Sequence, residues 1–195
     1  MAIPELIPVS KAEDATNGSW DAVVVVSSRF ALRDFPALSD LCRELAGIDA
    51  RIYDGVSLHR AEGAPGGRVV LAPTGPIDRD HDDVRRFGDA ARGGIARARD
   101  AGARQPLVVV EPDDASIEFA RTFEVALLEI LGGLWQPREA REARGEEATE
   151  PVQKIGIWTS GDAARIARVR ALEVGRRLSR DLGGTEPERM APPRF

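Results

Sequence analysis

The densest group of potential metal ligands is the acidic run Asp78–Asp83, in which four aspartates surround His81. Acids at alternate positions are typical of the start of a calcium-binding loop, which also needs glycine at its sixth position and a bidentate glutamate at its twelfth. Here those positions hold Asp83 and Asp89, so a calcium loop is excluded. We interpret the run instead as acids in the first turn of a helix, where unpaired N–H groups and the helix dipole favour negative charge.

A nucleophilic or zinc site would have to be built from very few residues. The chain has one cysteine, Cys42, and two histidines, His59 and His81, and it contains no HExxH, GxSxG or Walker sequence. Cys42 lies within an apolar stripe, which predicts a small core residue, and a nucleophilic pair with His59 is the alternative. A single cysteine cannot form an internal disulfide and fits a reducing compartment.

Two polar turns follow predicted strands and precede predicted helices, at Pro73–Ile77 and Thr159–Asp162. Ligands of parallel sheets bind outside the carboxyl ends of the strands, often with a phosphate at a helix N-terminus. The candidate ligand-binding residues are therefore Thr159, Ser160 and Gly161. The acid that ends this turn would repel a phosphate, and any strand-to-helix connection needs a turn, so a structural turn is the favoured interpretation.

These candidates need strands and helices to position them, and short β-branched runs alternate with helical patterns along the chain. Continuous apolar runs are typical of strands that are buried on both faces. The predicted strands are Ile3–Val9, Asp21–Ser27, Arg68–Ala72, Pro106–Val110 and Lys154–Trp158, with a weaker edge strand at Arg51–Leu58. Strands that alternate with helices predict an α/β fold with a mixed, mostly parallel sheet flanked by helices.

Four helices are predicted from apolar residues at a spacing of three to four. The first covers Leu38–Leu45 and stops at Gly47, and the second spans residues 80–101, where the Gly93-Gly94 pair indicates close packing or a kink. The third, Ile117–Leu131, should be the most buried and should close at Gly132-Gly133. The last carries an apolar stripe of Ala167, Ala171, Val174, Leu178 and Leu182, with Asp162 as a candidate cap.

Two features between these elements have simple interpretations. The segment Gln136–Pro151 is charged and lacks apolar periodicity, so we expect a solvated loop. The tryptophans Trp20, Trp135 and Trp158 are scattered, and no basic groove accompanies them. Packing in the core or at an interface therefore explains them better than base stacking.

Composition limits the function classes. The 195 residues suit one α/β domain with a short extra arm, and 43% hydrophobic with 30% charged residues is typical of a globular protein. A net charge of −5 argues against a nucleic-acid or anionic-membrane partner, because both attract clustered positive charge. We recognise neither a secretory signal nor an apolar run long enough to span a bilayer, so the cytoplasm is the expected location.

The C-terminal stretch Ala171–Phe195 reads ALEVGRRLSRDLGGTEPERMAPPRF. A long amphipathic helix is predicted to end at Gly183-Gly184 and to lead into a proline-bearing connector, which a folded domain needs only if something follows it. This stretch resembles the junction between the two domains of the leucyl (cytosol) aminopeptidase family, in its aminopeptidase-like branch. The residues that carry the resemblance are Arg180, Asp181, Gly183, Gly184, Pro187, Met190, Pro192 and Pro193.

The resemblance implies a macro-domain-like N-terminal domain over residues 1–160, a linker helix and connector over 161–195, and a catalytic domain beyond them. It also implies a homo-oligomer, usually a hexamer, that removes N-terminal amino acids from peptides with two divalent metals, zinc or manganese. No position here matches the family's catalytic or metal-binding motif, so no such residue is assigned and the chain alone is expected to be inactive. The alternatives are a stand-alone macro-like module for ADP-ribose or a related nucleotide, and a non-catalytic scaffold subunit.

Overall fold

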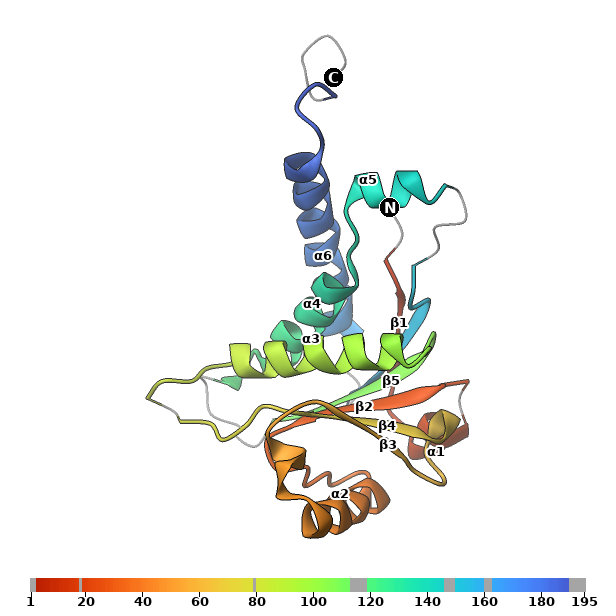
Figure 1. Cartoon of the computed structure of the whole chain (residues 1–195), viewed down its shortest axis with the longest axis vertical. Helices are drawn as coiled ribbons and strands as arrows, with labels where there is room; N and C mark the ends of the chain where they lie inside the picture. Colours follow the sequence, from red (N-terminus) through yellow and green to blue (C-terminus); the bar gives the residue numbers. More distant parts are fainter. Residues whose placement is uncertain are drawn as a thin grey trace.

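The computed structural model describes residues 3–17, 19–78, 80–112, 119–145, 150–159 and 163–189, which include one six-stranded sheet (Figure 1). The strands are β1 (Glu5–Val9), β2 (Ala22–Ser27), β3 (Ser57–Arg60), β4 (Arg68–Pro73), β5 (Pro106–Glu111) and β6 (Lys154–Trp158). Their spatial order is β1-β6-β5-β2-β4-β3, and each neighbouring pair is parallel except β3 with β4. The predicted mixed, mostly parallel α/β sheet is confirmed.

Helices cover both faces of this sheet. They are α1 (Ala12–Asn17), α2 (Pro36–Ile48), α3 (Arg85–Asp100), α4 (Thr122–Leu134), α5 (Arg138–Ala143) and α6 (Ala163–Gly184). Residues of α3, α4 and the start of α6 form one apolar core with the sheet, and residues of α1 and α2 form the other on the opposite face (Figure 1). No helix in the described ranges is both long and apolar enough to cross a membrane.

Strand β2 explains why the central strands are continuous apolar runs. Val24 and Val26 pack into the core under α3 and α4, whereas Val23 and Val25 pack into the core under α2. All four are buried. Successive side chains of a strand point to opposite faces, so a strand covered on both faces has no position left for a polar residue. Each fully buried valine contributes about 1.5–3 kcal/mol.

The predicted edge strand Arg51–Leu58 is wrong in its first half. Residues Ala50–Tyr53 form a 3₁₀ turn, η1, and Oδ1 of Asp49 accepts the backbone N–H of Arg51 at its start at 3.0 Å. This turn places Ile52 in the core. The strand itself is β3, which begins at Ser57 and pairs antiparallel with β4 at the edge of the sheet.

Several helix ends differ from the prediction. Helix α2 continues through Gly47 to Ile48, α3 begins at Arg85, and α4 runs through Gly132-Gly133 to Leu134. Glycine costs only about 1 kcal/mol in a helix, so tertiary packing overrides it as a stop signal. The predicted start of the third helix falls partly at residues 113–118, outside the described residues.

Two other predictions about helices can be compared with the structure. Helix α4 buries eight of its 13 residues, the largest share among the described helices, as predicted. The charged segment Gln136–Pro151 is not wholly a loop, because it contains α5, in which Arg138 donates to Glu142 at 2.8 Å. Such pairs four residues apart stabilise short charged helices.

Of the two alternatives predicted at Gly93-Gly94, close packing or a kink, the structure shows close packing. A Cβ atom on Gly94 would lie 2.7 Å from Cγ1 of Val24 and 2.9 Å from Cβ of Ala72. A Cβ atom on Gly93 would lie 3.0 Å from Cγ2 of Val56. The backbone of α3 therefore packs directly on β2 and β4. A side chain at Gly94 would prevent this close approach.

Candidate functional site on helix α6

The acidic run precedes α3 instead of occupying its first turn, so that interpretation is corrected. Asp82 accepts the backbone N–H of Asp78 at 2.9 Å, and Asp83 accepts the backbone N–H of Arg85 at 2.8 Å. Hydrogen bonds from Arg86 and Arg85 lower the pKa of Asp82 and of Asp83, respectively. These carboxylates shape a turn, and the described part of the chain holds no group of three or more His, Cys, Asp or Glu placed for a metal.

Cys42 is a core residue, as predicted. It is buried among the residues under α2, and burial raises the pKa of its thiol to about 11. A nucleophilic cysteine needs the opposite shift. His59 lies with Nε2 2.8 Å from the hydroxyl of Ser57, and burial lowers its pKa. Within the described ranges no hydrogen bond joins Cys42 to His59, so the structure does not form the nucleophilic pair.

The candidate ligand-binding turn after β6 is described only as far as Thr159. The backbone N–H of Thr159 donates to the carbonyl of Val9 at 2.9 Å and extends the pairing of β1 with β6. Ser160 and Gly161 lie outside the described residues. Ligand binding by these three residues therefore stays a prediction.

The turn after β4 uses its polar groups internally. The Thr74 hydroxyl donates to the carbonyl of Gly75 at 2.9 Å, and the Thr74 backbone N–H donates to the carbonyl of Ser27 at 3.2 Å. Gly75 has a φ of 70°, a conformation that glycine adopts without steric cost. These are the bonds of a structural turn, as the sequence favoured.

Two tryptophans pack within the domain, as predicted. The indole N–H of Trp20 donates to the carbonyl of Asp14 at 3.0 Å, and its ring lies over Gly156, where a Cβ atom would approach to 2.8 Å. The indole N–H of Trp158 donates to Asp34 at 2.9 Å. Both rings therefore serve to hold helices and loops against β6.

Helix α6 presents its apolar stripe to solvent, although such a stripe normally faces the core. Val174 and Leu178 expose 51% and 53% of their surface, and Leu182 exposes 43%. Ala167 and Ala171 are also exposed. The period predicted for this helix is correct, but its apolar stripe lies outside the core.

The face that α6 buries against α4 is charged. Glu173 and Arg177 are almost completely buried, at 0% and 1% exposure. Arg177 donates through Nε to Glu173 at 3.1 Å, through Nη1 to Glu150 at 2.7 Å and through Nη2 to the carbonyl of Leu131 at 3.3 Å. A buried charge requires such partners, because its removal from water costs several kcal/mol. This network determines which side of α6 faces inward.

Two further ion pairs join α6 to α4. Arg165 donates to Glu124 at 2.5 Å, and Arg176 donates to Glu129 at 3.1 Å. Burial alone would raise the pKa of Glu124, but hydrogen bonds from Arg165 and Arg121 outweigh burial and lower it. Glu124 therefore stays charged, and the contact between the two helices is electrostatic along much of its length.

The junction residues Arg180 and Asp181 continue this charged face. Asp181 accepts the indole N–H of Trp135 at 3.1 Å and pairs with Arg141 of α5 at 2.5 Å. The Arg180 guanidinium lies 5.7 Å from the centre of the Trp135 ring, a cation–π contact. Trp135 thus packs between helices, as predicted, and links α4 to the end of α6.

Helix α6 ends at Gly184, which confirms the predicted end at Gly183-Gly184. Pro187 follows and is exposed. Arg189 then donates to Glu142 of α5 at 2.7 Å. The remaining junction residues, Met190, Pro192 and Pro193, lie outside the described residues.

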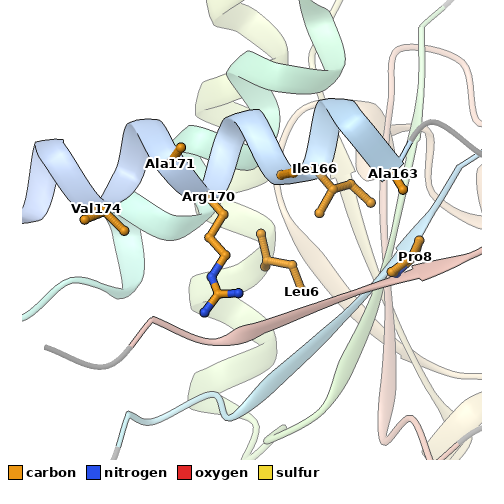
Figure 2. Close-up of a pocket in the computed structure, with 8 residues that line it drawn as sticks. Leu6, Pro8, Ala163, Ile166, Arg170, Ala171 and Val174 are labelled. Carbon is orange, nitrogen blue, oxygen red and sulfur yellow. The ribbon is translucent and has the colours of Figure 1, made fainter.

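A groove of about 570 Å³ lies between β1 and the first half of α6 (Figure 2). Leu6 points from β1 toward α6, and the side chain of Arg170 extends from α6 toward β1 (Figure 2). The groove is lined by Leu6, Pro8, Ala163, Ile166, Ala167, Arg170, Ala171 and Val174. It therefore joins the exposed stripe of α6 to the edge strand of the sheet.

The chain is similar to proteins that are named as aminopeptidases. No family model matches the chain. A Caenorhabditis elegans protein named "Putative aminopeptidase" is 31% identical over a match that covers 95% of this chain and 37% of the worm protein. A mutant of tomato leucine aminopeptidase has the same fold over 92% of this chain and 38% of its own, with a TM-score of 0.63 and 17% identity.

The predicted resemblance to the leucyl aminopeptidase family is confirmed. The aminopeptidase-related chain spans less than two fifths of each of these relatives. A mutant macrodomain of Oceanobacillus iheyensis, solved with ADPR, matches 89% of this chain and 94% of its own, with a TM-score of 0.53 and 11% identity. The predicted macro-like fold is confirmed as well.

Sequence reasoning missed the buried charges that orient α6. A signal was present, because Glu173 and Arg177 are four residues apart, the spacing at which opposite charges meet on a helix. Such pairs are usually exposed, so the spacing alone does not indicate burial.

Proposed function

We propose that this chain is the N-terminal accessory domain of a leucyl-aminopeptidase-like exopeptidase that removes N-terminal amino acids from peptides. The observation that carries the proposal is 31% identity to an aminopeptidase-named protein over 95% of this chain but only 37% of that protein. In this proposal the chemistry belongs to the rest of the polypeptide. The domain helps to assemble a homo-oligomer, such as a hexamer, in the cytoplasm and shapes access to the active site.

The proposal places two divalent metals, zinc or manganese, in the catalytic domain. The described residues of this chain do not fit such a pair, because no three His, Cys, Asp or Glu side chains are grouped among them. No position of this sequence matches the metal-binding motif of the family, and for that reason we assign no metal ligand and no catalytic residue here. In this proposal the role of the chain is structural, and the ion pairs between α6 and α4 hold the last helix in place on the domain.

The test compares the natural full-length polypeptide with the 195-residue chain. Both are assayed with leucine p-nitroanilide after addition of Zn²⁺ or Mn²⁺. We expect metal-dependent hydrolysis by the full-length polypeptide and none by the chain alone. Hydrolysis by the chain alone would overturn the accessory role, and a metal-loaded full-length polypeptide that cleaves no aminoacyl anilide would overturn the peptidase assignment.

A second candidate is a nucleotide-binding module, which is supported by the likeness to a macrodomain solved with ADPR. The ligand would lie at the carboxyl ends of the strands, near Thr159. Isothermal titration of the 195-residue chain with ADP-ribose separates the two candidates. The accessory-domain proposal expects no heat at millimolar ligand, whereas saturable binding would favour the module.

A further inference from the structure

The apolar stripe of α6 consists of Ala167, Ala171, Val174, Leu178 and Leu182, and it has no partner among the described elements. Its three larger side chains each expose between 43% and 53% of their surface. Scattered exposed hydrophobic residues are normal, but a continuous apolar surface bordered by charge marks an interaction site. The groove beside β1 widens this surface by adding Leu6 and Pro8.

Helix α6 cannot rotate so as to bury the stripe against its own domain. Rotation would carry Glu173 and Arg177, which both belong to α6, away from α4, and it would break the bonds of Arg177 to Glu150 and to the carbonyl of Leu131. Breaking a buried ion pair is strongly unfavourable. The charged face therefore holds the apolar stripe outward, available to another surface.

We propose that this stripe and the adjoining groove are the docking surface for the catalytic domain of the same polypeptide, an inference that rests on the proposed function. Both aminopeptidase-type relatives carry more than three fifths of their length outside the part matched here. The stripe also runs the length of the helix that the sequence identifies as the junction. A domain joined to this helix meets the stripe at a millimolar effective concentration, so a small apolar contact is sufficient.

A second copy of this chain fits the same surface less well. Stable interfaces between separate proteins bury about 800 Å² on each partner. Five partly exposed side chains on one helix, three of them no larger than valine, fall short of that area. The docked surface should be apolar with a carboxylate at its border, because the guanidinium of Arg170 extends from α6 into the groove (Figure 2).

The experiment uses two leucines on α6 that are equally exposed. Leu178 lies in the stripe and exposes 53%, whereas Leu172 exposes 50% and lies about 120° away around the helix. Leu178→Asp and Leu172→Asp are introduced separately into the natural full-length polypeptide. Thermal unfolding and limited proteolysis then report whether the two domains behave as one unit.

We expect Leu178→Asp to separate the unfolding transitions of the two domains and to speed cleavage between them at least tenfold. Leu172→Asp should change that rate less than twofold. In the 195-residue chain both variants should keep the wild-type melting temperature, since both positions are already exposed. Equal behaviour of the two variants in the full-length polypeptide would overturn the proposal.

Two further outcomes locate the error if the proposal fails. A concentration-dependent dimer of the 195-residue chain that only Leu178→Asp abolishes would assign the stripe to a second copy. If Leu178→Asp separated the domains in a full-length polypeptide that has no peptidase activity, the docking surface would be supported and the proposed function would be overturned. The docking readout is therefore independent of catalysis.

Discussion

At the scale of single residues, burial determines what each reactive group of this domain can do. Cys42 and His59, the residue types most often used for nucleophilic chemistry, are both shifted by burial toward their neutral forms. The thiol of Cys42 has no neighbouring charge that lowers its pKa, and desolvation raises it to about 11. We therefore assign Cys42 to packing under α2.

This assignment predicts a slow thiol. A rise in pKa from 9.0 to about 11 reduces the thiolate fraction at pH 8 about 100-fold, and only the thiolate reacts. Labelling of the native chain with a thiol-specific disulfide reagent should thus be at least 100-fold slower than labelling in guanidinium chloride. Fast labelling of the natively folded chain would show that Cys42 is accessible and activated.

At the scale of elements, the contact between α4 and α6 depends on charge where most helix contacts depend on apolar area. The variant Arg177→Met leaves Glu173 and Glu150 without their shared partner. It should lower the free energy of unfolding by about 3–5 kcal/mol, as is typical when one member of a buried pair is removed. Urea unfolding of the 195-residue chain measures this loss.

The control for this prediction is Arg168→Met, which removes an exposed arginine from the same helix. Exposed substitutions usually change stability by less than about 0.5 kcal/mol. The double variant Glu173→Leu/Arg177→Met should recover part of the loss, because it also removes the buried carboxylate, which without Arg177 keeps only its pairs with Arg176 and Arg180. If Arg177→Met and Arg168→Met proved equally mild, the network would not be what orients α6.

The same helix shows where sequence reasoning stops. Strands β2, β4 and β5 were predictable because both of their faces are buried, so hydrophobicity alone identifies them. The length and end of α6 were also predictable, from its period and from Gly183-Gly184. Its orientation was not, because hydrophobicity assigns the apolar stripe to the core, while the buried pair Glu173–Arg177 imposes the reverse.

The candidate site was likewise predictable in part, where residue identities were enough, and not where the outcome depended on local bonds. The junction motif was found from residue identities at Arg180 and Asp181, which require no knowledge of packing. The acidic run was misplaced, because the local bonds of Asp82 and Asp83 delay the start of α3 to Arg85. Short-range side-chain bonds compete with helix formation, and their outcome is not visible in a pattern of residue types.

At the scale of the whole molecule, carboxylates are held by arginines on several surfaces, and this gives stability a common dependence on pH. Hydrogen bonds from Arg189 and Arg138 lower the pKa of Glu142 from 4.5 to about 2. Arginines lower the pKa of other carboxyls in the same way, at Asp49, Asp82 and Asp83. Each depressed pKa contributes stability that is present above the unfolded pKa and lost as pH falls toward the folded one.

The lowered pKa of His59 acts in the same direction from about pH 6.5 downward, because the unfolded state binds its proton more readily. The melting temperature should thus fall from pH 6 to pH 2.

In Glu142→Gln the fall in melting temperature between pH 4.5 and pH 2 should be shallower, whereas Glu44→Gln, at an exposed position of α2, should follow the wild type. Because Glu142 and Arg189 are partly exposed, 1 M NaCl should shrink the difference between Glu142→Gln and wild type. Parallel acid profiles of Glu142→Gln and wild type at low salt would mean that the bond from Arg189 does not hold the junction to α5.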